Sequence, residues 1–155
     1  DGADQRHIKE WNIIRCFQSE RLFKISAGMR SRQTKRTVGQ SKFDFSGFNI
    51  DLSGGSQGTQ YTYYYTITLE NRSNVTLKNM TIEYHIYYRQ QKNKSVKCGK
   101  IWIHQMDPKS KKREETTEGI PDYIGDIFYY QEVKVDGIWI RVTLPLSGDR
   151  KVVRE

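Results

Sequence analysis

The sequence has little cysteine: of its 155 residues, only Cys16 and Cys98 carry a thiol. This excludes the disulfide framework that holds many small secreted domains together. A chain of this length buries roughly 70% of its unfolded surface, so it can form a core without metals or several bridges. One bridge and two free thiols both stay open. A Cys16–Cys98 bridge would close a loop of about 82 residues and contribute ~4 kcal/mol in the chain-entropy model.

Long apolar runs are also lacking. No segment approaches the 18 or more apolar residues of a membrane span, and no secretory signal pattern is present. The chain begins at Asp1 rather than Met, so we expect an upstream segment to have been removed. Removal by processing would fit an exported protein of the extracellular space, the periplasm or the cell envelope. No stretch has the periodicity of a convincing helix.

The motifs of common catalytic and metal sites are missing as well. No C-x-x-C, H-x-x-x-H or EF-hand spacing occurs. The G-x-S-x-G string at residues 54–58 lies in a glycine-rich connection that leads into a strand pattern, not into the helix that a nucleophile elbow requires. Cys98 and His104 lack the surroundings of a thiol-protease pair, and a structural role is favoured for Cys98. Asp122 and Asp126 are favoured as turn residues over calcium ligands. We therefore expect no enzyme activity, no metal and no cofactor.

Positive charge is what the sequence has in excess. Lysine and arginine number 26 against 18 acidic residues, for a formal net charge of +8. This balance permits, but does not require, attraction to nucleic acid, anionic lipid or acidic polysaccharide. The basic residues form three groups: Arg30, Arg32, Lys35 and Arg36; Lys92, Lys94, Lys97 and Lys100; and Lys109, Lys111, Lys112 and Arg113. Glutamates follow the third group, and basic residues also protect sheet edges, so nucleic acid is not the expected partner.

Alternation of apolar and polar side chains dominates residues 61–88. The apolar positions are Tyr63, Tyr65, Ile67 and Leu69, then Met80, Ile82, Tyr84, Ile86 and Tyr88. We expect these faces to be buried, and the two strands to form an antiparallel hairpin. Its turn is the Asn- and Ser-rich break at Asn71–Asn79, with Leu77 directed inward. Tyr64 and Tyr87 fall among the polar positions and are predicted to point outward.

Further strands are predicted on both sides of this pair. Residues 22–32 alternate with a basic far half, whereas Arg89–Lys100 is interpreted as a basic loop and DPKSKKREE as a charged hairpin tip. A bulge is predicted at Asp136-Gly137 in the last long strand. Trp139 in that strand and Trp102 in an earlier one are predicted to point outward. Residues 1–20 are interpreted as a first strand or an N-terminal arm rather than a short helix.

Seven or eight strands separated by turn signals predict one all-β domain over residues 1–155, a two-sheet antiparallel β-sandwich. The pattern Y-x-I-x-L-x-N-x-S at residues 65–73, followed by L-x-N-M-T-I-E-Y-x-I-Y-Y at residues 77–88, resembles bacterial immunoglobulin-like and fibronectin type III-like modules of uncharacterised secreted proteins. The resemblance covers Tyr61–Tyr88 well and Gly137–Leu146 more loosely, and the Cys…Trp…Cys spacing of antibody domains is absent. It implies a sandwich and no particular activity.

These observations favour a non-catalytic, exported structural or protein-interaction module, whose partner is a protein or another component of the cell envelope. Two other binding functions stay open. In a polysaccharide-binding module, sugars would stack on Tyr64, Tyr87, Trp102 and Trp139, although outward aromatics also stabilise sheets through cross-strand pairs. The three basic groups would bind a polyanion if loops brought them together. Four N-x-S/T triplets, at Asn71, Asn74, Asn79 and Asn93, are glycosylation acceptors in a eukaryotic secreted protein and turn residues in a bacterial one.

Overall fold

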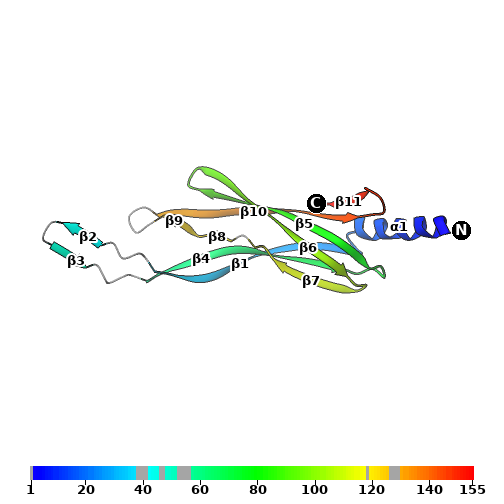
Figure 1. Cartoon of the computed structure of the whole chain (residues 1–155), viewed down its shortest axis with the longest axis horizontal. Coiled ribbons are helices and arrows are strands. Elements are labelled where there is room, and N and C mark those ends of the chain that lie inside the picture. Colours follow the sequence, from blue (N-terminus) through cyan, green and yellow to red (C-terminus); the bar gives the residue numbers. More distant parts are fainter. Residues whose placement is uncertain (1, 38–41, 46–47, 52–56, 118, 126–129) are drawn as a thin grey trace.

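The computed structural model describes residues 2–37, 42–45, 48–51, 57–117, 119–125 and 130–155. Two antiparallel sheets pack face to face, with a helix at one end (Figure 1). The four-stranded sheet contains β1 (Phe23–Thr37), β4 (Gln57–Asn71), β7 (Ser110–Glu115) and β8 (Ile120–Pro121). The five-stranded sheet contains β5 (Leu77–Gln90), β6 (Asn93–Met106), β9 (Tyr123–Gly125), β10 (Tyr130–Pro145) and β11 (Lys151–Arg154). The predicted two-sheet sandwich is confirmed, and β2 (Lys42–Phe45) and β3 (Phe48–Asp51) form a separate pair.

The core lies between the sheets and uses the faces that the alternation predicted. Its buried residues include Tyr65, Ile67 and Leu69 of β4 and Leu77, Met80, Ile82, Tyr84 and Ile86 of β5. Tyr63 and Tyr88 are half-buried and pack against this cluster. Burial of each large apolar side chain contributes about 1.5–3 kcal/mol, so this pair of facing strands accounts for much of the stabilisation. Among the described residues, no helix is both long and apolar enough to span a membrane.

The predicted hairpin of β4 and β5 is wrong, because the two strands belong to different sheets. β4 pairs with β1, β7 and β8, whereas β5 pairs with β6 and β10. Residues 72–76 therefore carry the chain across the sandwich. Alternation shows which face of a strand is buried. It does not show whether a second strand lies beside the first in the same sheet or opposite it in the other sheet. The chain takes the second arrangement.

Asn71 fixes this crossing. Its side chain is 1% exposed, and its Nδ2 donates to the carbonyl oxygens of Val75 at 2.7 Å and Asp107 at 3.0 Å. Its Oδ1 accepts from the backbone N–H of Ser73 at 3.1 Å and from the Ser73 hydroxyl at 2.6 Å. Asp107 lies in the connection from β6 to β7, which also crosses between the sheets. One amide thus joins two crossings, and in the folded protein it is inaccessible as a glycosylation acceptor.

Two segments predicted as a loop and a tip are strands. Most of Arg89–Lys100 belongs to the β5–β6 hairpin, in which only Gln91 and Lys92 lie between the strands. Ser110–Glu115 is β7, which pairs with β4 across its whole length. The predicted bulge is present as a register shift between Val135 and Gly137. β6 and β7 lie at the edges of their sheets, where one face is solvated and carries charged side chains. These charges made the two segments resemble loops in the sequence.

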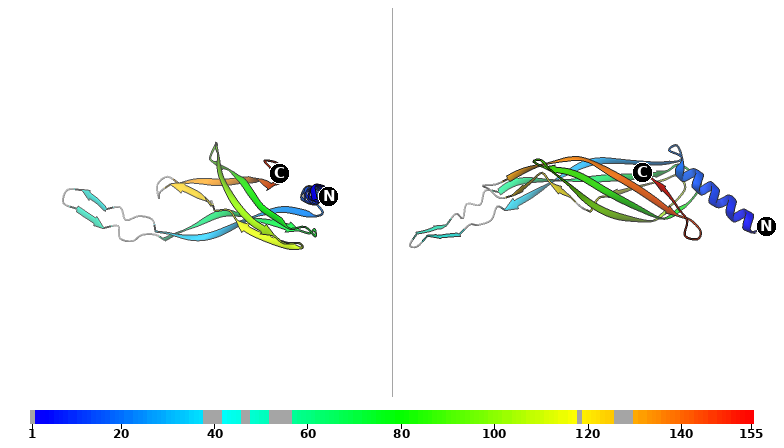
Figure 2. Two further views of the ribbon diagram at one scale, coloured as in Figure 1. Left: turned by 45° about the vertical axis from the view of Figure 1, so that its right-hand side comes forward. Right: turned by 90° about the horizontal axis from the view of Figure 1, so that it is seen from above.

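The strand interpretation of residues 1–20 is also wrong: Gly2–Gln18 is the helix α1. Glu10, Ile13, Ile14 and Phe17 recur at the spacing of one helical face, and this face meets the end of the sandwich. Phe17 is fully buried and stacks on Phe23, with ring centroids 5.0 Å apart. The rest of α1 projects away from the sheets (Figures 1 and 2). An apolar cluster this short matches alternation nearly as well as helical period, which caused the error.

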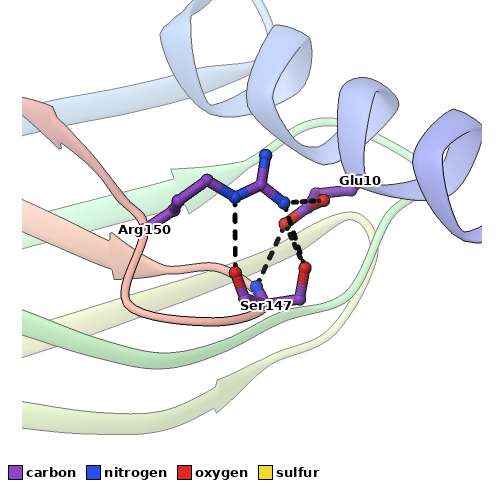
Figure 3. A network of polar contacts seen from close by, with 3 residues as sticks. All are labelled: Glu10, Ser147 and Arg150. Atoms are coloured by element: carbon purple, nitrogen blue, oxygen red, sulfur yellow. Dashed lines mark hydrogen bonds and ion pairs between the residues drawn. The ribbon is translucent and has the colours of Figure 1, made fainter.

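Glu10 anchors α1 to the turn between β10 and β11 (Figure 3). Its Oε1 accepts from the Ser147 backbone N–H at 3.0 Å and from the Ser147 hydroxyl at 2.8 Å. Its Oε2 accepts from Arg150 Nη2 at 2.5 Å. The hydrogen bond from the Ser147 hydroxyl is the main cause that lowers the pKa of Glu10, and Arg150 adds to it.

We expect the docking of α1 to weaken as the pH falls. A carboxylate whose pKa is lower in the folded state contributes stability above its unfolded pKa, and that contribution is lost as the pH falls through the folded value. Urea unfolding of wild type and Glu10→Gln should therefore differ at neutral pH and converge in acid. The exposed Glu20→Gln is the matched control and should show no such convergence. A difference between wild type and Glu10→Gln that is constant with pH would contradict this role of Glu10.

Candidate functional site

The outer face of the five-stranded sheet holds three of the four predicted aromatic candidates. Residues 81, 83, 85, 87 and 89 of β5 alternate with its core positions and so point outward. The register then places Trp139, His85 and Cys98 in one row, Gly137, Tyr87 and Val96 in the next, and Thr143, Thr81 and Trp102 at the other end. Paired residues of neighbouring strands share a face. We call the surface formed by His85, Tyr87, Val96, Trp102 and Trp139 the aromatic face.

Three rings on this face are in contact. His85 lies 4.7 Å from Trp139 between ring centroids, and 6.3 Å from Tyr87 in an edge-on arrangement. The guanidinium of Arg141 lies over the Trp139 ring, 4.8 Å from its centroid. Such contacts are worth about 0.5–1.5 kcal/mol for aromatic pairs and about 0.5–1 kcal/mol for an exposed cation over a ring. The rings are therefore held in place before any partner arrives.

The aromatic face is open to solvent at its β6 side. Trp102 is 65% exposed and Tyr87 is 45% exposed, and Val96 beside Tyr87 is also exposed. Trp139 contacts His85 and Arg141, and its side chain is half-buried. A single exposed apolar side chain needs no explanation, but several on one sheet face indicate a contact surface.

The charges around the aromatic face are largely paired. Lys100 Nζ lies 2.8 Å from Glu83 Oε1, and its hydrogen bond lowers the pKa of Glu83. Arg89 holds Asp136 through both carboxylate oxygens at 2.7–2.9 Å, which raises the pKa of Arg89. Arg141 also bonds Glu155. These pairs leave the face with little net charge from the residues that make them.

Tyr64, the fourth aromatic candidate, lies apart from the others. It is half-buried on the outer side of the four-stranded sheet. The guanidinium of Arg32 lies over its ring, 5.0 Å from the centroid, and the same guanidinium bonds Glu115 at 3.1 Å. The structure therefore places Tyr87, Trp102 and Trp139 together and Tyr64 on the opposite face of the molecule.

The three basic groups do not form one site. The first and third lie on β1 and at β7 in the four-stranded sheet, and the second lies in the β5–β6 hairpin of the other sheet. Lys97 Nζ donates to the Gly119 carbonyl at 2.9 Å. The side chains of Lys35 and Arg36 are outside the described residues. Arg30, Lys111 and Arg113 share the outer face of the four-stranded sheet with Tyr64, so a polyanion would meet them there.

The cysteines and the candidate metal ligands form no site in the part of the chain that the structure describes. Cys16 and Cys98 are free thiols, so the possible bridge is not formed. Cys98 and His104 lie on one strand, roughly 20 Å apart at the usual rise per residue. No group of three or more His, Cys, Asp or Glu among the described residues is arranged to hold a metal ion. Asp122 Oδ1 is buried without a hydrogen bond among these residues, and Asp126 lies outside them.

A groove of about 440 Å³ lies between α1 and the end of the sandwich. Its lining includes Ile13, Leu144 and Leu146. Glu10, the acidic group in this groove, is already engaged by Ser147 and Arg150. The groove therefore combines an apolar floor with the basic side chains of Arg6, Lys9 and Lys78.

His85 and Val96 belong to the aromatic face, and Arg141 stacks on Trp139, but none of the three was predicted as a site residue from the sequence. His85 alternates with the core positions of β5 and therefore lies on its outer side. The missing information was the strand register, which decides which outward residues become neighbours. The pairing of β5 with β10 places His85 beside Trp139, and no local sequence pattern indicates that pairing.

No model of a protein family matches the chain, and no curated protein matches its sequence. The two-sheet architecture is compatible with an immunoglobulin-like fold, and this compatibility concerns architecture alone.

Proposed function

We propose that this protein is a non-catalytic, exported module of the immunoglobulin-like or fibronectin type III-like class that binds another protein of the cell envelope through its aromatic face. The observation that carries the proposal is the exposure of Tyr87, Val96 and Trp102 on one sheet face, next to the Trp139–Arg141 stack. Tyr, Trp and Arg are the residues most enriched at the energetic centres of protein interfaces. The ion pairs that surround the aromatic face are typical of the polar rim of a protein interface.

A protein partner fits this face better than a polysaccharide does. Sugar stacking needs free ring faces, but the Trp139 ring is in contact with both Arg141 and His85. Trp102 is well exposed, but it lies at the far end of the face from Tyr87. A polyanion fits less well still, because the charges nearest the rings are paired with acids.

Replacing both Tyr87 and Trp102 by serine should abolish most binding to the partner. Each residue at an interface centre is worth about 1–2 kcal/mol or more, so the double variant should bind on the order of a hundredfold more weakly. The measurement compares retention of wild type and variant on solubilised envelope proteins of the organism that makes the chain, with and without protease treatment. Tyr64→Ser on the opposite sheet is the matched control and should bind like wild type.

Two results would contradict the proposal. Retention on purified envelope polysaccharide that survives protease treatment and requires Trp102 would identify a sugar-binding module. Retention on heparin that falls steeply with salt and is unchanged in the double variant would identify a polyanion site on the four-stranded sheet.

A further inference from the structure

Helix α1 has a second apolar surface that the sandwich does not cover. Ile8 is 60% exposed and Trp11 is 59% exposed, although the helix buries Ile13, Ile14 and Phe17. At 3.6 residues per turn, Ile8 and Trp11 point about 140° away from the docked side. The surface is therefore free of the chain's own sheets.

Two opposite charges flank this surface along the helix. Asp4 lies one turn before Ile8, and Arg15 lies one turn after Trp11. All four fall within about 60° around the helix axis and make a single stripe. Both charged residues are exposed, and the Arg15 guanidinium lies 5.6 Å from the centroid of the Trp11 ring. We call Asp4, Ile8, Trp11 and Arg15 the α1 stripe.

The α1 stripe is complementary to itself in one orientation. Its spacing of four, three and four residues is that of alternating d and a positions in a coiled coil. The stripe is symmetric about its midpoint, so a copy running the opposite way sets the apolar pair against the apolar pair. The acid of each helix then meets the arginine of the other. A parallel copy would instead set acid against acid and arginine against arginine.

We infer that α1 binds α1 of a second copy of this chain in an antiparallel pair with two-fold symmetry. Ile8 packs against Trp11 of the partner subunit, and Asp4 pairs with Arg15 of the partner subunit. A two-fold interface uses the same patch on both copies, as this stripe requires. The projection of α1 from the end of the sandwich leaves space for a second helix (Figure 2). The inference does not depend on the proposed function.

The pair should be weak and dependent on concentration. A helix of 17 residues is about 25 Å long, and one helix face of this length buries less area than stable interfaces do. We expect sedimentation equilibrium of the whole chain to show a monomer at low micromolar concentration and a dimer toward the millimolar range. Replacing Trp11 by serine should remove the dimer.

Charge reversal tests the orientation. Asp4→Arg alone and Arg15→Asp alone each turn two attractive contacts into repulsive ones, so each should weaken the dimer by about tenfold or more. An equimolar mixture of the two variants should restore the dimer, because each like-charged helix then meets its opposite. Lys9→Asp makes the same change of charge as Arg15→Asp, but outside the stripe, and should leave the dimer intact. Circular dichroism of each variant checks that α1 is still helical.

Two results would overturn the inference. The first is a wild-type protein that stays monomeric into the millimolar range. The second is a dimer that Asp4→Arg leaves unchanged, since a parallel pair or an interface elsewhere on the sandwich would behave in this way. Failure of either kind leaves binding through the aromatic face untouched, because Tyr87 and Trp102 lie on the five-stranded sheet.

Discussion

Replacing Asn71 by alanine is expected to lower the free energy of unfolding by about 3 kcal/mol. The amide is buried and makes four hydrogen bonds, two as donor and two as acceptor. The substitution leaves the carbonyls of Val75 and Asp107 and the N–H of Ser73 without this partner in a place that water reaches poorly. An unsatisfied buried polar group costs about 1–3 kcal/mol, which is more than the net worth of the bond itself.

The measurement is urea unfolding of wild type, Asn71→Ala and Asn74→Ala. Asn74 lies in the same crossing and belongs to another N-x-S/T triplet, but its side chain is exposed. We expect Asn74→Ala to stay within about 0.5 kcal/mol of wild type. Equal effects of the two alanine variants would show that the crossing does not depend on the Asn71 amide. Asn71→Asp keeps the size and the acceptor but removes the donor, so it should be strongly destabilised as well.

The role of Asn71 shows where prediction from sequence reaches its limit. The alternation in residues 61–88 identified the buried sides of β4 and β5, because burial of a strand face is a local property of the sequence. It left open whether the two strands pair or face each other. That choice depends on the conformation of five residues and on a bond to Asp107, which lies 36 residues further along the chain. Long-range contacts of this kind leave no period in the sequence.

Long-range contacts also explain why the helix α1 and the grouping of the aromatic residues could not be predicted from the sequence. Residues 2–18 contain one short apolar cluster, and only docking against Phe23 and the end of the sandwich selects the helical arrangement. In the candidate site, the outward direction of Tyr87 and Trp139 was predictable, because side chains alternate between the two faces of a strand. Their proximity follows from the pairing of β5 with β10. The separation of Tyr64 follows from the membership of β4 in the other sheet.

Gly99 is the position at which the smallest chemical change should have a large effect. Gly99 pairs with Tyr84 across β5 and β6. A Cβ at Gly99 would lie 2.2 Å from the Tyr84 hydroxyl oxygen and 2.3 Å from Cζ. The Tyr84 ring therefore lies across the glycine, and it is fully buried there. Its hydroxyl is 3.0 Å from Thr117 Oγ1 and accepts from the Thr117 backbone N–H at 3.1 Å.

Gly99→Ala is expected to lower the free energy of unfolding by about 3 kcal/mol. The added methyl group must displace the ring, and the ring cannot move without losing its bonds to Thr117. Gly137→Ala is the matched control, because a Cβ at this strand glycine meets nothing within 4 Å. Its effect should be small, or slightly stabilising through the unfolded chain.

A double-mutant cycle separates this cause from others. In a Tyr84→Ala background the methyl group at Gly99 has room, so the penalty of Gly99→Ala should largely disappear. A penalty that persists in full would place its origin in the backbone of β6 and not in the ring. Because β6 also carries Val96 and Trp102, the two origins differ in their effect on binding. A displaced ring acts on the core and leaves the aromatic face intact, whereas a distorted strand would weaken binding through it as well.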